Sequence, residues 1–246
     1  KGPVFVYSGM GPQWWAMGRE LLESDSEFRK AVLECDVHIS KLADWSLIEE
    51  LTATEAESRI EETQIAQPAI FAVQVGLTFM WRSWGIEPDA IVGHSAGEVA
   101  AAWAAGSLSL PDACRVIYER SRLQHLTEGE GRMMAVGLPV SEVTHAIIGY
   151  EDQVSIGAVN SPSSVTLVGD ESSLEAIGEK LDKQEVFRRM LYGKVPYHSP
   201  AMDRIKPELI ASLETLTPKT ANIPLFSTVY GKQVDGTELG PSYWAD

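Results

Sequence analysis

The sequence predicts an α/β fold in two parts: a large subdomain with a mainly parallel sheet flanked by helices, and an inserted subdomain of βαββαβ order. Two observations predict it. Up to residue 126, short apolar runs alternate with segments of helical periodicity, which is typical of a parallel sheet covered by helices. From Arg132 onward the order changes, and two strands follow one another with no helix between them.

The large part opens with Val4–Tyr7, a short apolar run between Pro3 and a glycine turn, which predicts a buried strand. Ala90–Val92 predicts a second strand. Helices are expected at 26–42 with Ser26 as the cap, at 67–84 with Pro68 in the first turn and Gly85 after the end, at 98–105 before Gly106, and at 111–126. The stretch Gly231–Asp246 has weak periodicity, so no element is predicted there.

The inserted part has a different order of elements. Strands are expected at 133–138, 154–159, 165–169 and 186–191, and helices at 140–148 and 172–181, with Asn160–Ser163 joining the two middle strands. This is a ferredoxin-like pattern. We therefore expect residues 131–192 to form the small subdomain, and residues 1–130 with 193–246 to form the large one.

Charge and composition exclude several classes of protein. The chain carries 20 lysines and arginines against 35 aspartates and glutamates, a net charge of −15, which argues against a nucleic-acid surface. No apolar run reaches the roughly 18–20 residues of a membrane span, and no signal peptide is expected. Cys35 and Cys114 form neither a disulfide framework nor a metal spacing. A cytoplasmic location is expected, and because the chain opens on Lys1 without Met we interpret it as a segment of a longer protein.

A candidate nucleophile lies between the second strand and an alanine-rich helix. Gly93-His94-Ser95-Ala96-Gly97 is a G-x-S-x-G motif in the strand–turn–helix context of a nucleophile elbow, which makes the large subdomain hydrolase-like. The glycines allow a sharp turn, and the start of the helix offers N–H groups to developing negative charge. A plain strand-to-helix turn is the alternative.

A serine nucleophile needs a base. The histidines are His38, His94, His125, His145 and His198. His38 and His145 are expected on helix surfaces and His125 at a helix end. His94 points elsewhere along the turn. His198, in a proline-flanked loop, is favoured only slightly over a surface histidine.

An oxyanion hole needs two backbone donors. Elbow geometry offers the N–H of Ala96, and the Ser8–Gly11 turn after the first strand could supply the N–H of Met10; an ordinary glycine turn is the alternative.

Several motifs occur together in one order. They are Ser8-Gly9-Met10-Gly11-Pro12-Gln13-Trp14, Gln67-Pro68-Ala69-Ile70-Phe71, Gly93-His94-Ser95-Ala96-Gly97-Glu98, Arg120-Ser121-Arg122 and Tyr197-His198-Ser199. From Pro3 to the last residue the chain resembles the acyltransferase domain of modular polyketide synthases, which is related to malonyl-CoA:acyl-carrier-protein transacylases.

The resemblance implies a role for each matching residue. Ser95 matches the nucleophile and His198 the general base, which a backbone carbonyl holds, so neither Asp170 nor Asp182 is nominated as a triad acid. Met10 and Ala96 match the oxyanion donors. Arg120 matches the arginine that binds the free carboxylate of a malonyl-type substrate; without the family it reads as a solvated helix position. The residues that match polar or bulky positions lining the cleft are Gln13, Gln67, His94, Asn160 and Tyr197.

The resemblance also implies the reaction and its partners. A malonyl-type extender unit moves from CoA to the phosphopantetheine thiol of an acyl carrier protein, with no bound cofactor or metal, beside neighbouring domains such as a ketosynthase. Productive docking of an acidic carrier needs a basic patch, for which the candidates are Arg188, Arg189 and Lys194; a solvated strand edge is equally plausible. No nucleic acid or membrane partner is expected.

Extender choice and the rival functions stay open. Tyr197 is bulky, which favours malonyl, whereas the small Ala96 frees space that methylmalonyl could use, and one methyl group discriminates by only about 1–3 kcal/mol. The rivals are a serine hydrolase or thioesterase, for which Arg120 has no use, and a non-catalytic docking domain. Family members usually continue past this point, so we expect the C-terminal part of the large subdomain, including the carbonyl-bearing segment, to lie outside this sequence or on a separate stretch.

Overall fold

The computed structural model describes residues 2–246, which divide into two compact units. The first unit contains the described residues up to Leu123 together with Glu208–Asp246, and the second contains Gln124–Pro207. The joints expected near residues 130 and 193 fall inside the second unit. None of the helices in residues 2–246 combines the length and the apolar character that a membrane crossing requires.

The sheet of the first unit is mainly parallel. Its strands, in spatial order, are β1 (Val4–Tyr7), β2 (Ala90–Gly93), β7 (Leu225–Ser227) and β8 (Lys232–Val234). The first three run parallel and β8 runs antiparallel to β7, which confirms the predicted class of fold. In the β1–β2 register Tyr7 lies opposite Gly93, so the turns that follow these two strands meet at the same edge of the sheet.

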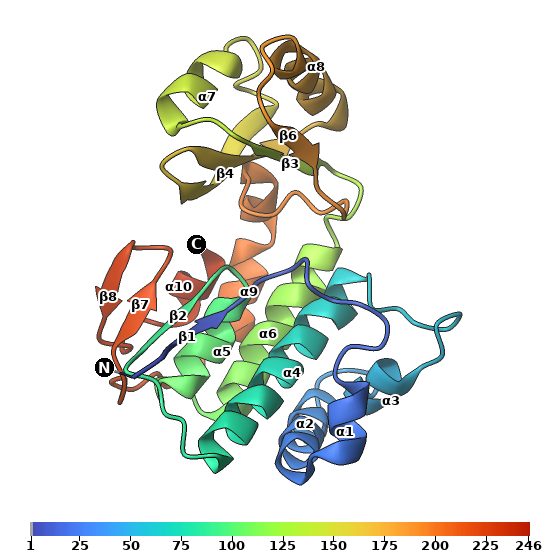
Figure 1. Cartoon of the computed structure of the whole chain (residues 1–246), viewed down its shortest axis with the longest axis vertical. Coiled ribbons are helices and arrows are strands. Elements are labelled where there is room, and N and C mark those ends of the chain that lie inside the picture. Colours follow the sequence, from blue (N-terminus) through green and yellow to red (C-terminus); the bar gives the residue numbers. More distant parts are fainter. Residues whose placement is uncertain (1) are drawn as a thin grey trace. The chain divides into compact units, whose positions relative to one another are not determined.

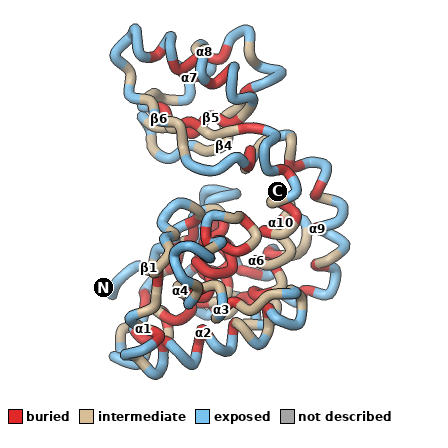
Figure 2. The backbone as a smooth tube through the Cα atoms, turned by 90° about the vertical axis from the view of Figure 1, so that its right-hand side faces the viewer, coloured by how far each residue is buried: buried red, intermediate tan, exposed pale blue. Residues whose placement is uncertain are grey.

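Helices pack on this sheet and in further layers beside it. They are α1 (Arg19–Ser24), α2 (Ser26–Ile39), α3 (Leu47–Thr52), α4 (Thr63–Ser83), α5 (Gly97–Ala104), α6 (Leu110–His125), α9 (Lys206–Ser212) and α10 (Pro241–Ala245). Helix α5 packs on the sheet and contacts both β1 and β2, and α4 and the α1–α3 helices lie in the further layers (Figure 1). Ile91, Phe71, Val99 and Ile117 are at most 1% exposed, so strand and helices share one core, drawn in red in Figure 2.

Two helix starts differ from the prediction. The cap of α2 is Asp25, whose carboxylate accepts a hydrogen bond from the Phe28 N–H at 2.8 Å, and not Ser26. Helix α4 begins at Thr63, so Pro68 lies inside the helix and not in its first turn. The first turn was not predicted because it opens with the polar residues Thr63 and Gln64. The helix continues through Pro68 because the missing N–H of proline removes only one helical hydrogen bond.

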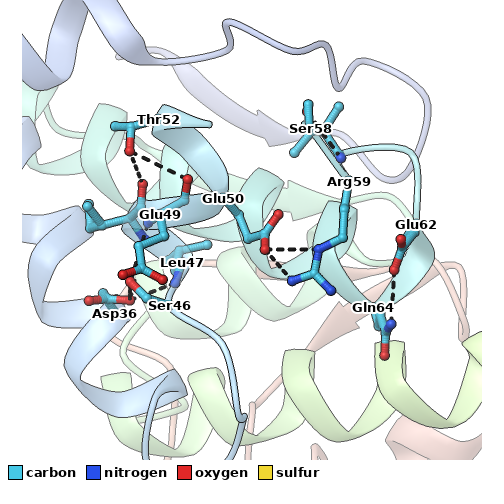
Figure 3. Close-up of polar contacts among 12 residues, drawn as sticks. Asp36, Ser46, Leu47, Glu49, Glu50, Thr52, Ser58, Arg59, Glu62 and Gln64 are labelled. Carbon is cyan, nitrogen blue, oxygen red and sulfur yellow. Dashed lines mark hydrogen bonds and ion pairs between the residues drawn. The ribbon is translucent and has the colours of Figure 1, made fainter. Parts of the chain in front are cut away.

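Polar contacts hold the segment around α3, which the sequence did not predict (Figure 3). The Asp36 carboxylate on α2 accepts hydrogen bonds from the Ser46 hydroxyl at 3.0 Å and from the Leu47 N–H at 2.7 Å, at the start of α3. The Arg59 guanidinium pairs with the Glu50 carboxylate (Figure 3). These contacts attach α3 and the following loop to the helical layer.

The second unit contains an antiparallel sheet. Its strands, in spatial order, are β4 (Val154–Ser161), β5 (Ser164–Gly169), β3 (Arg132–Val136) and β6 (Arg188–Met190). Helices α7 (Val140–Ala146) and α8 (Glu171–Asp182) contribute to a core formed by Met134, Val143, Leu167, Leu174 and Ile177. The order β3-α7-β4-β5-α8-β6 confirms the ferredoxin-like prediction. A 3-10 helix, η1, spans Pro200–Arg204.

One expected connection is wrong, and one stretch contains elements that the sequence did not predict. Asn160 lies in strand β4 and not in a loop, because Ser161 already pairs with Ser164 and the turn shortens to Pro162 and Ser163. The stretch 231–246, for which no element was predicted, contains both β8 and α10.

Candidate active site

Ser95 occupies the turn between β2 and α5. Its φ is 52°, in the left-handed region that non-glycine residues rarely adopt, and in residues 2–246 it shares this feature only with Glu185 and His198. Such a conformation costs of order 1–3 kcal/mol and persists only where the surroundings impose it. The strained serine confirms the elbow geometry that the G-x-S-x-G motif predicted.

The two glycines of the motif are required by close packing. A Cβ atom on Gly93 would lie 2.4 Å from the Glu98 nitrogen, and a Cβ atom on Gly97 would lie 2.2 Å from the Tyr7 carbonyl oxygen. The His94 N–H donates to that same Tyr7 carbonyl at 2.8 Å. The elbow is therefore built directly against the end of β1, with no room for side chains at either glycine.

The Ser8–Gly11 turn lies against Ser95. A Cβ atom on Gly9 would be 2.8 Å from the His94 carbonyl oxygen and 3.2 Å from the Ser95 Cβ. The turn is held by the Gln74 amide, which donates to the Ser8 carbonyl at 2.8 Å. The structure thus brings the residue next to Met10 into contact with the candidate nucleophile.

Ala96 is the N-cap residue of α5 and is 4% exposed. Backbone N–H groups at a helix start lack intrahelical acceptors and carry partial positive charge. Ala96 therefore has the position that an oxyanion donor needs, directly after the serine, and Met10 lies in the adjoining turn. This arrangement is suited to stabilising a tetrahedral oxyanion.

Three further predicted residues lie in the first unit. The Gln13 Oε1 accepts the Gly11 N–H at 2.8 Å and so closes the turn that contains Met10. Gln67 on α4 is 1% exposed, whereas His94 is exposed. Gln13 therefore shapes the backbone of the turn.

Arg120 lies on α6 and is half-buried. Arg122, its neighbour in the same motif, forms two ion pairs. Its guanidinium lies 2.8 Å from the Glu119 carboxylate and 2.9 Å from the Glu208 carboxylate. The chain's own carboxylates therefore pair with Arg122, and the assignment of Arg120 to a substrate carboxylate stays a prediction.

The remaining predicted residues lie in the second unit. His198 has a φ of 58°, and the turn around it is closed by the Ser199 hydroxyl, which donates to the Pro196 carbonyl at 2.7 Å. The Tyr197 carbonyl lies over β4, 3.5 Å from where a Cβ atom on Gly157 would stand. The Asn160 amide donates to the Thr166 hydroxyl at 2.9 Å. Since Ser95 and His198 belong to different units, their pairing stays a prediction.

Asp170 and Asp182, which a hydrolase would offer as triad acids, are engaged elsewhere. The Asp170 carboxylate caps α8 by accepting the Ser173 N–H at 2.8 Å. The Asp182 carboxylate binds the Arg188 guanidinium, with Nε 3.0 Å from Oδ1. The same ion pair removes Arg188 from the predicted basic patch, which reduces to the exposed Arg189 and Lys194.

One buried carboxylate beside the elbow was missed. Glu98, directly after the motif, is 7% exposed and accepts hydrogen bonds from Thr228 and Tyr243, far along the chain. An acidic residue opening an alanine-rich apolar helix is the pattern that could have identified it. No group of three or more histidine, cysteine or acidic side chains in the described part of the chain could hold a metal ion.

The family model described as "Acyl transferase domain" matches residues 4–246. Polyketide synthase GfsE of Streptomyces halstedii is 42% identical over 246 residues, covering 98% of this chain and 6% of the relative. Erythronolide synthase EryA2 of Saccharopolyspora erythraea is 37% identical over 241 residues, covering 98% and 7%.

A solved structure agrees in fold as well as in sequence. The loading acyltransferase from the avermectin modular polyketide synthase superposes with a TM-score of 0.94 at 36% identity, covering 99% of this chain and 78% of that chain. The chain spans only a small part of the length of the curated synthases, 6% and 7% of the two named above.

Proposed function

The chain belongs to the acyl transferase domain family found in modular polyketide synthases, and from this premise we propose that it moves a malonyl-type extender unit from CoA to the phosphopantetheine thiol of an acyl carrier protein through an ester on Ser95. The observation that carries the proposal is the left-handed Ser95 at the start of α5, with the Gly9–Met10 turn packed against it. A strained serine beside two preset backbone donors suits acyl transfer.

The first half-reaction loads the serine. His198 takes the proton from the Ser95 hydroxyl, and the oxygen attacks the thioester carbonyl of acyl-CoA. The N–H groups of Met10 and Ala96 stabilise the oxyanion of the tetrahedral intermediate. The carbon–sulfur bond then breaks, the imidazolium returns its proton to the leaving sulfur, and CoA thiol departs from acyl-Ser95.

The second half-reaction reverses these roles. His198 takes the proton of the phosphopantetheine thiol, and the thiolate attacks the Ser95 ester. The oxyanion again rests on Met10 and Ala96. The carbon–oxygen bond breaks, the serine regains its proton, and the acyl group leaves on the carrier protein. The two steps form a ping-pong sequence, which needs no cofactor.

Arg120 selects carboxylated donors. A guanidinium binds a carboxylate through two parallel hydrogen bonds, which both orients the substrate and rejects uncharged acyl groups. Support comes from the half-buried position of Arg120 on α6, at the place that matches the carboxylate-binding arginine of the family. Arg120 also occupies polar space that water would otherwise use for hydrolysis.

We assign malonyl as the preferred extender unit, with methylmalonyl as the alternative. The large Tyr197 before His198 restricts the space beside the α-carbon, whereas Ala96 after the nucleophile leaves room. The difference of one methyl group is worth about 1–3 kcal/mol in a pocket, so small changes at these positions shift the preference.

The proposed partners are an acyl carrier protein and neighbouring synthase domains. The relatives are multidomain synthases, of which this chain matches a short segment. The net charge of −15 opposes an acidic carrier, so docking depends on local basic residues such as Arg189 and Lys194. The strand edge at β6 carries the first of these.

Intact-protein mass spectrometry tests the proposal. The chain is incubated with a panel of acyl-CoA donors that includes malonyl-, methylmalonyl-, acetyl- and propionyl-CoA, and Ser95→Ala serves as the control. We expect one malonyl adduct on the wild type and none on the variant. Rapid release of free acid with no stable adduct would favour the rival thioesterase.

A further inference from the structure

A buried cluster of hydrogen bonds surrounds the Glu98 carboxylate at the first turn of α5. Its Oε1 accepts the Thr228 N–H at 2.5 Å and the Thr228 hydroxyl at 2.8 Å. Its Oε2 accepts the Tyr243 hydroxyl at 2.6 Å. Because Tyr243 donates to Glu98, the Ser227 hydroxyl donates to Tyr243 in turn, at 2.7 Å. Three donors from the C-terminal segment therefore bind this one acid directly, and a fourth, the Ser227 hydroxyl, binds it through Tyr243.

The same residue also holds the nucleophile. The Glu98 N–H donates to the Ser95 carbonyl at 2.9 Å. Glu98 thus binds the Ser95 backbone through its own backbone and binds Thr228 and Tyr243 through its side chain. Any movement of the first turn of α5 would displace the Ser95 carbonyl with it.

The cluster is matched to a carboxylate, which accepts on both of its oxygens. The hydroxyl groups of Thr228 and Tyr243 can rotate, but the Thr228 N–H cannot, and each donor left unmatched in a buried site is costly. Burial raises the pKa of Tyr243, and the Glu98 carboxylate raises it further, so the phenol keeps its proton and remains a donor. A glutamine would have to present an amide N–H to one of these donors.

We propose that Glu98 is a positioning residue for acyl transfer: its carboxylate attaches the first turn of α5 to Thr228 and Tyr243 and so maintains the left-handed backbone of Ser95. The inference rests on the proposed function, because it concerns the same serine. Strained backbone survives only where surrounding contacts impose it, and here those contacts reach the nucleophile through one residue.

The test compares two variants with two matched controls in the same unit. Glu98→Gln removes the charge at the elbow, and Tyr243→Phe removes one donor. Glu50→Gln removes another carboxylate, far along the chain, which pairs with Arg59 (Figure 3). Tyr230→Phe removes a hydroxyl from a 46% exposed ring that packs edge-on against Tyr243, with centroids 5.4 Å apart.

The readout separates positioning from folding. Rapid-quench loading of Ser95 by malonyl-CoA gives three quantities: the amplitude, which counts folded competent protein, the first-order rate constant at saturation, and the donor concentration at half-saturation. We expect Glu98→Gln to lower the rate constant about tenfold, within the roughly 100-fold that a 1 Å misplacement costs. We expect Tyr243→Phe to lower the same rate constant about threefold, since the Glu98 carboxylate loses one of its donors. Amplitude and half-saturation stay at wild-type values, and both controls match the wild type.

Each outcome decides between the alternatives. A fall in amplitude alone, or wild-type rate constants in both variants, overturns the positioning role and leaves the proposed function intact. If the wild type itself does not load, the proposed function fails instead. If Glu98→Gln does not fold, the rate constant of the milder Tyr243→Phe decides the question.

Discussion

Gly9 and Ser95 lie so close together that a methyl group on Gly9 would stand 3.2 Å from the Ser95 Cβ. The same methyl group would lie 2.8 Å from the His94 carbonyl oxygen, nearer than real Cβ atoms approach. The turn after β1 therefore reaches the elbow only because residue 9 has no side chain. The position of the Met10 N–H depends on that approach.

Gly9→Ala should lower the rate of Ser95 acylation by about 100-fold, because it displaces the Met10 donor and loss of one oxyanion donor costs 10²–10³. Gly240→Ala is the matched control, since a Cβ atom there meets nothing within 4 Å. Loading kinetics by mass spectrometry measure both. Equal rates for Gly9→Ala and the wild type would exclude Met10 from the oxyanion hole.

Replacing Ser95 should reveal the energy held in its backbone. With φ at 52°, Ser95→Gly relieves strain that Ser95→Ala keeps, so the glycine variant should be more stable by about 1 kcal/mol, although both fail to load acyl groups. Glu185→Gly, at φ 56°, is the control and should load normally. Chemical denaturation measures the difference, and an alanine variant at least as stable as the glycine variant would contradict it.

Arg120→Ala should reduce the preference for malonyl over acetyl donors and raise hydrolysis relative to transfer. The reason is the loss of a bidentate carboxylate contact, worth about 1.5–3 kcal/mol or roughly 10- to 100-fold in selectivity. A competition assay with both CoA esters measures the ratio. Arg122→Ala, whose partners are Glu119 and Glu208, should keep the wild-type ratio. An unchanged ratio in Arg120→Ala would remove that residue from substrate recognition.

Tyr197→Ser should increase the use of methylmalonyl-CoA by up to about 10- to 100-fold relative to malonyl-CoA, because it opens space beside the α-carbon that one methyl group can fill. The loading ratio on intact protein measures the change. Tyr150→Phe, an aromatic change elsewhere in the second unit where the ring contacts Lys180, serves as the control. No shift in the ratio would count against Tyr197 as the selectivity residue.

Asp170 should contribute to the acid sensitivity of α8. Hydrogen bonds from the Ser172 hydroxyl and from Ser173 lower the pKa of Asp170 in the folded state. Its stabilisation is therefore present above the unfolded value of about 3.9 and is lost as the pH falls through the lower folded value. Asp170→Asn keeps the cap but should flatten this pH dependence, whereas Asp170→Ala should cost about 1 kcal/mol at pH 7. Hydrogen exchange of the α8 amides measures both effects. If Asp170→Asn shows the wild-type acid dependence, groups other than Asp170 cause the acid sensitivity of α8.

The longer elements could be predicted from sequence because enough residues repeat the pattern. Helices α4 and α6 and the alternating elements between 132 and 191 lie within a few residues of their predicted places. Helices α1 and α3, with six residues each, and strands β7 and β8, with three each, are too short to show a period. Their stability comes from contacts made elsewhere, such as the Asp36 carboxylate at the start of α3.

The residues of the candidate site likewise divide into those that a local motif reveals and those that depend on distant contacts. The glycine motif revealed Ser95 because turn, nucleophile and helix start are adjacent in sequence. The role of Glu98 could not be predicted, since its partners Thr228 and Tyr243 lie 130 and 145 residues away. Asp182 is the opposite case. From the sequence it could be taken as the acid that orients a catalytic histidine, but in the structure its carboxylate is bound to Arg188.

Three non-glycine residues in the described chain have a left-handed backbone, and two of them, Ser95 and His198, are the proposed nucleophile and base. A search of torsion angles alone, with every side chain erased, would have returned both, with Glu185 as a third. Chains without any recognisable relative can be searched in this way, using conformational strain as a guide to chemistry.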